Sequence, residues 1–206
     1  MPEQRHTDAV LESFAATQVV LREREARDRC WWDEMANCFH AESYVEISWF
    51  QGSGAEFTAQ SKVMSESAVP SRHRLGPPTV RINESRGVVF LPAMVETYPT
   101  VQDLQCVMAA HCRLLYRVQQ ADGGWKIAGM QAIYERDELR PVLPSARLTV
   151  DPAELAQLRH PYRWLSWTLA QAGYSIDQDL VADDRPEAVS ALHAEVFEWA
   201  GLNSPR

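Results

Sequence analysis

The chain has 206 residues, of which 46% are hydrophobic and 23% charged, which suits one globular domain with a sizeable core and an extension. Its formal net charge of −8 disfavours nonspecific binding to nucleic acid or to anionic membrane surfaces, so we expect neither as a partner. The apolar runs are too short to span a bilayer and the N-terminus has no apolar signal region, which predicts a cytoplasmic protein with four free thiols.

The first part of the chain is predicted to be mainly helical. We expect a helix over about residues 7–28 and a short second helix over 31–39. Residues 44–50 alternate and are rich in β-forming side chains, which predicts a strand. A turn at 51–54 and a helix over 55–67 complete this part.

The pattern then changes to long strands. We predict strands over 72–82, interrupted by Gly76-Pro77-Pro78, and over 87–98, 101–118 and 125–134. Tight turns at 83–85 and 121–124 join consecutive strands, as in an antiparallel meander. Helices followed by such strands indicate an α+β fold, with the helices packed on one face of a strongly curved antiparallel sheet.

The C-terminal part is predicted to be a helical extension. Residues 141–152 read as a linker, followed by helices over 151–173 and 184–199, with Asp151-Pro152 as the start signal of the first. We therefore divide the chain into an α+β domain, residues 1–140, and a linker with C-terminal helices, residues 141–206, packed on the same domain. Covering a pocket mouth or a partner subunit is the alternative role for these helices.

Asp28 is the residue that first suggests a functional site. Phe14, Leu21 and Asp28 are spaced seven apart, so in one helix they share a stripe that ends in an acid. An acid on a core-facing stripe costs free energy unless it is paired, protonated or used in chemistry. The alternative is that Asp28 only ends its helix or caps the next one.

Three motifs in the same order carry a resemblance to a known family. The segment DRCWWD at 28–33 resembles the acid-turn-Trp-Asp signature of SnoaL-like members of the nuclear transport factor two-like superfamily. Residues 116–129 are similar to the closing hairpin of that family, and SRHRL at 71–75 lies where these enzymes often carry a His. The resemblance covers about residues 7–137, and its nearest branch is scytalone dehydratase and the bile-acid dehydratases. It implies a cone-shaped α+β fold around an apolar pocket.

The resemblance also implies that Asp28 and His73 form a catalytic Asp–His pair. Two residues depart from scytalone dehydratase: Arg27 stands where that enzyme has a Tyr, and residues 90–98 contain no His. These departures argue against scytalone as the substrate and leave open another dehydratase, an isomerase or a cyclase. A His near its ordinary pKa of roughly 6.5 can act as base and then as acid, and a carboxylate beside it fixes the tautomer, so we expect no cofactor.

Five further side chains are predicted to bind substrate. On an ideal strand Cys112 and Leu114 point away from His111, and this apolar set suits the pocket side. Because His111 and Cys112 point to opposite faces, they cannot jointly close a metal site, and we predict none. The predicted substrate-binding residues are Trp49, Tyr98, Cys112, Leu114 and Trp32. Trp49 could equally be ordinary core, and Tyr98 an edge residue.

The sequence thus predicts a cofactor-independent lyase or isomerase that acts on an apolar, carbonyl-bearing ring compound. A noncatalytic module that binds a ligand or a partner protein is the alternative, because fold alone does not separate the two. We also expect a homodimer, since the outward sheet face that carries Leu115 beside Arg113 and Arg117 is only half polar.

Overall fold

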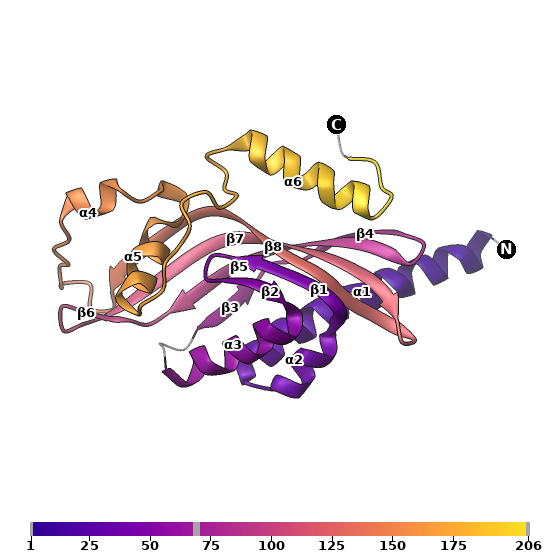
Figure 1. Cartoon of the computed structure of the whole chain (residues 1–206), viewed down its shortest axis with the longest axis horizontal. Coiled ribbons are helices and arrows are strands. Elements are labelled where there is room, and N and C mark those ends of the chain that lie inside the picture. Colours follow the sequence, from indigo (N-terminus) through magenta and orange to yellow (C-terminus); the bar gives the residue numbers. More distant parts are fainter. Residues whose placement is uncertain (1, 68–70, 205–206) are drawn as a thin grey trace.

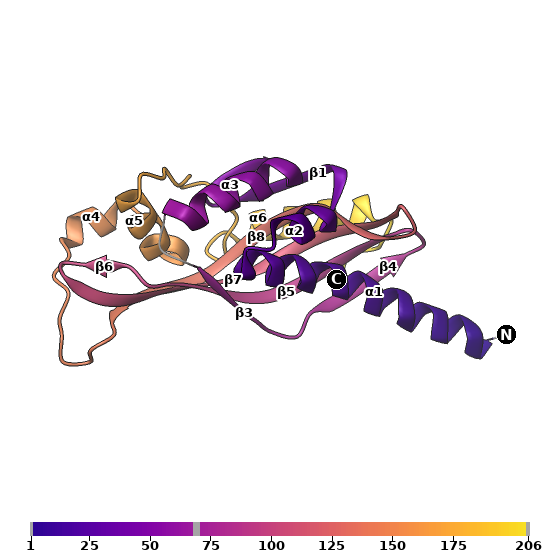
Figure 2. The same cartoon turned by 90° about the horizontal axis from the view of Figure 1, so that it is seen from below.

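A curved sheet with helices on both faces forms the body of the protein (Figures 1 and 2). The computed structural model describes residues 2–67 and 71–204. The helices are α1 (Pro2–Arg29), α2 (Trp32–Cys38), α3 (Gly54–Ser67), α4 (Pro152–Ala156), the 3-10 turn η1 (His160–Tyr162), α5 (Arg163–Gln171) and α6 (Pro186–Trp199). The strands are β1 (Phe39–Ile47), β2 (Phe50–Ser53), β3 (Arg72–Leu75), β4 (Thr79–Asn83), β5 (Arg86–Thr97), β6 (Thr100–Val101), β7 (Leu104–Ala121) and β8 (Gly124–Pro141). Within the described ranges, no helix combines the length and apolar character needed to cross a membrane.

The sheet confirms the α+β prediction, with one correction to its strand directions. The strand order is β2-β1-β8-β7-β5-β3, and β4 and β6 pair with β5 and β7. The long hairpin of β7 and β8 and the pairs of β5 are antiparallel, as predicted, but β1 runs parallel to β8. A parallel pair needs a long connection, and here nearly the whole domain lies between the two strands.

Several predicted boundaries were wrong for local reasons. Residues 51–53 of the predicted turn lie in strand β2 and Gly54 begins α3, because the chain reverses earlier, at Ser48 and Trp49. Strand β7 begins at Leu104 because Gln102 and Asp103 adopt positive φ angles and form a turn. The helix predicted over 151–173 is divided into α4, η1 and α5, since Pro161 has no N–H to donate and disfavours helix in the preceding residue.

Helix α1 buries a different stripe from the one predicted. Phe14 is 62% exposed, whereas the buried positions recur three and four residues apart. They are Ala16, Val19, Val20, Glu23, Arg24, Ala26 and Arg27. Because three of these are charged, the true stripe does not look apolar in the sequence. The charged half of the stripe lies beside Asp28 at the end of the helix.

Helix α6 covers the outer face of the sheet. Its Leu192, Val196 and Phe197 pack on Val88, Leu115 and Ile133, as one buried cluster. Leu115 is only 2% exposed, so the face from which a homodimer was predicted is already covered within one chain. The outer sheet face therefore no longer supports the prediction of a homodimer.

Helix α5 closes the inner side of the fold near the ends of β7 and β8. Leu165 belongs to the inner core, and its backbone N–H donates to Asp137 Oδ2 at 2.7 Å. Burial is the largest influence on Asp137 and raises its pKa to about 6. The C-terminal segment therefore packs against the inner core through α5 and against the outer face through α6.

Two Phe-to-Ala changes test the assignment of the buried faces. Phe197→Ala removes a ring that is 2% exposed and stacks on Phe90, and we expect it to lower the free energy of unfolding by about 3 kcal/mol. Phe14→Ala, the matched control on α1, should change it by less than about 0.5 kcal/mol because the side chain is exposed. Urea unfolding of both variants measures this, and equal losses would contradict the description of α1 and α6.

Candidate active site

Asp28 and His73 are brought together by α1 and the edge strand β3. Asp28 is the penultimate residue of α1, and His73 pairs with Val95 of β5. Asp28 Oδ1 lies 2.6 Å from His73 Nδ1, and Asp28 Oδ2 accepts the backbone N–H of His73 at 2.7 Å. One carboxylate thus holds both the ring and the backbone of the same residue.

The tautomer of His73 follows from its two neighbours. Arg24 Nη1 lies 3.2 Å from His73 Nε2, and a guanidinium can only donate, so Nε2 accepts. The ring proton then sits on Nδ1, where it donates to Asp28. In this tautomer the basic lone pair of the imidazole is on Nε2, on the side of the ring away from the carboxylate.

The pKa shifts of the pair are consistent with this arrangement. Burial lowers the pKa of His73 below its ordinary 6.5, and the positive charges of Arg24 and Arg27 add to this, while Asp28 acts in the opposite direction. Burial alone would raise the pKa of Asp28, but the hydrogen bond and charge of His73 outweigh it and leave this pKa below 3.8. At neutral pH the pair is a carboxylate beside a neutral imidazole.

Arg24 is held by a second buried acid. Its guanidinium forms two hydrogen bonds with the carboxylate of Glu23, which also accepts from the hydroxyl of Tyr116 at 3.3 Å. All three residues are at most 3% exposed. The charge of Arg24 is thus neutralised locally, which stabilises an otherwise costly group in the core.

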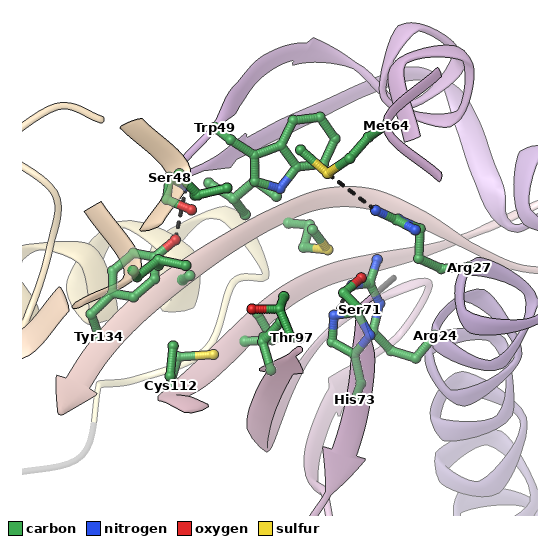
Figure 3. Close-up of a pocket in the computed structure, with 18 of the residues that line it drawn as sticks. Arg24, Arg27, Ser48, Trp49, Met64, Ser71, His73, Thr97, Cys112 and Tyr134 are labelled. Carbon is green, nitrogen blue, oxygen red and sulfur yellow. Dashed lines mark hydrogen bonds between the residues drawn. The ribbon is translucent and has the colours of Figure 1, made fainter. Parts of the chain in front are cut away.

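An apolar cavity extends from His73 into the fold (Figure 3). The volume of this cavity is about 80 Å³. Its wall consists of Arg24, Arg27, Ile47, Ser48, Trp49, Phe57, Met64, Ser71, His73, Val95, Thr97, Ala110, Cys112, Leu114, Met130, Ala132, Tyr134, Leu165 and Leu169. The cavity is therefore small, and most of its lining side chains are apolar.

The two ends of the cavity differ in chemistry. Arg24, Arg27 and His73 lie at one end, and Tyr134 lies at the other, where its hydroxyl oxygen accepts the Ser48 N–H at 2.8 Å (Figure 3). Burial strongly raises the pKa of Tyr134, so its hydroxyl stays neutral. Asp28 and His73 also border a separate polar groove between α1 and β3, so the pair is not sealed from solvent.

The structure places three of the five predicted substrate-binding residues on the cavity wall. Trp49, Cys112 and Leu114 line it, whereas Tyr98 and Trp32 do not. Tyr98 lies one residue beyond the cavity-lining Thr97, so it points to the opposite side, where it donates to Glu96. Trp32 begins α2 and packs against the inner core instead.

Sequence reasoning missed the basic end of the cavity. Arg24 lies four residues before Asp28, one helical turn away, so helical spacing alone could have placed it beside the acid. In the sequence, Arg27 stands out only because scytalone dehydratase has a Tyr at this position. Ser71 and Tyr134 had no signal in the sequence. His111 is absent from the cavity wall, as predicted. Among residues 2–67 and 71–204, no three His, Cys, Asp or Glu side chains gather in a way that could hold a metal ion.

Comparison with known proteins identifies the family. The profile of the SnoaL-like domain matches residues 10–131, which is more than half of the chain. The chain belongs to the SnoaL-like family. The matched segment contains both members of the Asp28–His73 pair and ends within β8, before α4, α5 and α6.

Relatives are known from both sequence and structure. Pea pathogenicity protein 2 of Fusarium vanettenii is 27% identical over 179 residues, 82% of this chain and 76% of that protein. A candidate scytalone dehydratase from Novosphingobium aromaticivorans has a similar fold, with a TM-score of 0.52 and 15% identity over 69% of this chain and 99% of the other. The hexachlorocyclohexane dehydrochlorinase LinA-type3 of Novosphingobium barchaimii gives a TM-score of 0.56 and 10% identity, covering 71% and 99%. At these identities the two structures show the fold alone.

Protonation of His73 tests the geometry of the pair. We expect the imidazole to stay neutral to below pH 6.5 as the pH falls, because burial and Arg24 disfavour its charged form. Asp28→Asn should lower the pKa of His73 further, since Asp28 is the group that favours the charged ring. Nitrogen NMR shifts measured against pH, with His73→Ala for assignment, report this. A pKa that rises in Asp28→Asn would contradict the described contact.

Proposed function

We propose that the protein is a cofactor-independent lyase or isomerase that acts on a flat, mostly apolar, carbonyl-bearing ring compound. The observation that carries this proposal is the hydrogen-bonded Asp28–His73 pair with its imidazole on the wall of an apolar cavity. Membership in the SnoaL-like family and the dehydratase-type fold neighbours support the same coarse class.

The first step is removal of the proton on the carbon next to the carbonyl group. His73 Nε2 takes this proton, and the C–H bonding electrons move into the enolate. The imidazolium that forms keeps its Nδ1–H bond to Asp28, whose negative charge stabilises it. The low pKa of His73 keeps the base unprotonated at neutral pH.

Arg24 has to change its partner during this step. A lone pair that accepts from Arg24 cannot take a substrate proton at the same time, so the Arg24 N–H must move to another acceptor. The developing enolate oxygen is such an acceptor, and a buried guanidinium stabilises its negative charge. Glu23 keeps Arg24 at the site throughout.

The second step decides between the two reaction types. In a dehydration, His73 Nε2–H gives its proton to the leaving hydroxyl, which departs as water while the enolate electrons form the new double bond. In an isomerisation the same proton returns to a different carbon. Both outcomes use the same pair, so the position of a leaving group in the substrate selects between them.

The noncatalytic binding module makes a different use of the same cavity. A cone filled by side chains, or an Asp28 that caps a helix away from His73, would favour the binding module. A cavity bordered by His73, with Asp28 and His73 in contact, supports the enzyme.

The cytoplasmic location and the homodimer stay predictions. Light scattering at micromolar concentration tests whether the protein is a homodimer.

Proton exchange separates enzyme from binding module. We expect wild-type protein in deuterated buffer to incorporate deuterium at the carbon next to the carbonyl of cyclic β-hydroxy or unsaturated ketones, followed by proton NMR. His73→Ala should abolish this exchange. Asp28→Asn should slow it by about 10²–10⁴-fold, because the tautomer and the imidazolium lose their partner.

The matched control is His160→Ala, which removes an exposed imidazole from the C-terminal segment and should leave the exchange rate unchanged. Circular dichroism and the unfolding midpoint show whether each variant keeps its fold. Ligand binding without exchange in the wild type, or wild-type exchange in a folded His73→Ala variant, would refute the proposed chemistry.

A further inference from the structure

Arg27 is a buried cation that faces the cavity with little to neutralise it. It is 6% exposed and follows Arg24 by three residues, so both side chains lie on the same buried face of the helix. Within the described residues its guanidinium donates one hydrogen bond, to Met64 Sδ at 3.6 Å, and it takes part in no ion pair. A thioether is a weak acceptor, so most of the donor capacity of Arg27 is unused.

Arg24, on the same face of α1, does have a carboxylate partner, so the lack of one at Arg27 is specific to that position. Arg24 has a carboxylate from Glu23 on two of its nitrogens, and the adjacent Tyr116 completes that network. The carboxylate of Asp28 makes its hydrogen bonds to His73 instead. Glu23 and Asp28, the two acids whose charges act on Arg27, thus form their hydrogen bonds with other residues.

The balance of charges around Arg27 supports the same conclusion. Burial lowers its pKa to about 10, and the charge of Arg24 acts in the same direction, while Glu23 and Asp28 only partly offset them. Arg27 therefore stays a cation at neutral pH, in surroundings that disfavour its charge. An uncompensated buried charge is strongly destabilising, and a residue of this kind is held for a purpose or has a partner that binds later.

We propose that the cavity binds a ligand with an anionic oxygen, and that this oxygen pairs with the Arg27 guanidinium. The chemical class is a flat, apolar ring compound that carries a carboxylate, or a hydroxyl acidic enough to ionise near neutral pH. Arg27 offers a planar fork of N–H donors that matches a carboxylate and also suits a single anionic oxygen. The apolar walls formed by Phe57, Met64 and Val95 take the ring.

This position also orients the ligand relative to the proton-transfer pair. Arg27 and His73 lie at the same end of the cavity, with Ser71 between them and Tyr134 at the far end (Figure 3). An oxygen on Arg27 holds the adjoining carbons of the ring near His73 and sends the rest of the ring toward Tyr134. The inference rests on the cavity of the proposed function, but not on its chemical step.

Binding of unreactive probes tests the proposal by calorimetry. The probes are trans-cinnamate for a carboxylate, 4-nitrophenolate for an ionised hydroxyl, and trans-cinnamamide as the neutral match of the first. We expect wild-type protein to bind at least one anion, and the neutral amide about 10- to 100-fold more weakly than cinnamate if the carboxylate is the preferred form. Preference for 4-nitrophenolate would assign the oxygen to an ionised hydroxyl instead.

Variants of Arg27 assign the effect to one side chain. Arg27→Met should weaken binding of the preferred anion by about 10- to 100-fold, with an unchanged or raised thermal midpoint because a buried charge is removed. Arg27→Lys keeps the charge and should retain part of the affinity, which covers the case in which the Met variant folds poorly. Arg29→Met is the matched control, since Arg29 is exposed on the same helix and lies outside the cavity wall.

The outcomes separate this inference from the proposed enzyme. Arg27-dependent anion binding without proton exchange would support the inference and refute the chemistry. If exchange on neutral ketones persists in Arg27→Met and the preferred anion binds equally well to this variant and to wild-type protein, the chemistry is supported and the inference is refuted. The inference is also overturned if wild-type protein binds neither anion at millimolar concentration, or binds the amide as tightly as both anions.

Discussion

The two hydrogen bonds that His73 donates to Asp28 are the contact on which the site depends. One oxygen fixes the imidazole and the other fixes the backbone of the same residue, so the carboxylate joins the end of α1 to the edge strand β3. A strand of four residues at a sheet edge has few other constraints. The interaction that sets the tautomer therefore also sets the position of the strand that carries the ring.

This arrangement requires charges in the core, and the fold neutralises them unequally. Glu23 and Arg24 neutralise each other, and Asp28 is stabilised by His73, but Arg27 is left with a thioether. Functional sites commonly reduce stability in this way, because a group preorganised for a ligand is not satisfied without it. Among the described contacts, this unequal neutralisation singles out Arg27 as the buried cation of α1 that has no carboxylate partner.

The sequence supports the fold and the pair better than the rest of the site. Long alternating strands and clear turns predicted the β5–β7–β8 meander. The resemblance to the SnoaL-like family implied the pairing of Asp28 with His73, and the two side chains lie in contact. The heptad spacing that first singled out Asp28 was misleading, since Phe14 is exposed and the buried stripe runs through Glu23, Arg24 and Arg27. Buried charges are invisible to a search for apolar periodicity, because only the tertiary contacts that neutralise them explain their position.

The cavity also joins two parts of the chain with different roles. Its polar end comes from α1 and β3, which lie inside the segment shared with the SnoaL-like family. Leu165 and Leu169, which close part of its apolar wall, come from α5, beyond the matched residues 10–131. Asp137 of β8 holds the start of α5 in place, so the wall is attached to the sheet near the limit of the shared domain. The wall that α5 contributes is thus separate in the chain from the Asp28–His73 pair, so a change at Leu165 or Leu169 can alter the shape of the cavity without altering the contact of the pair.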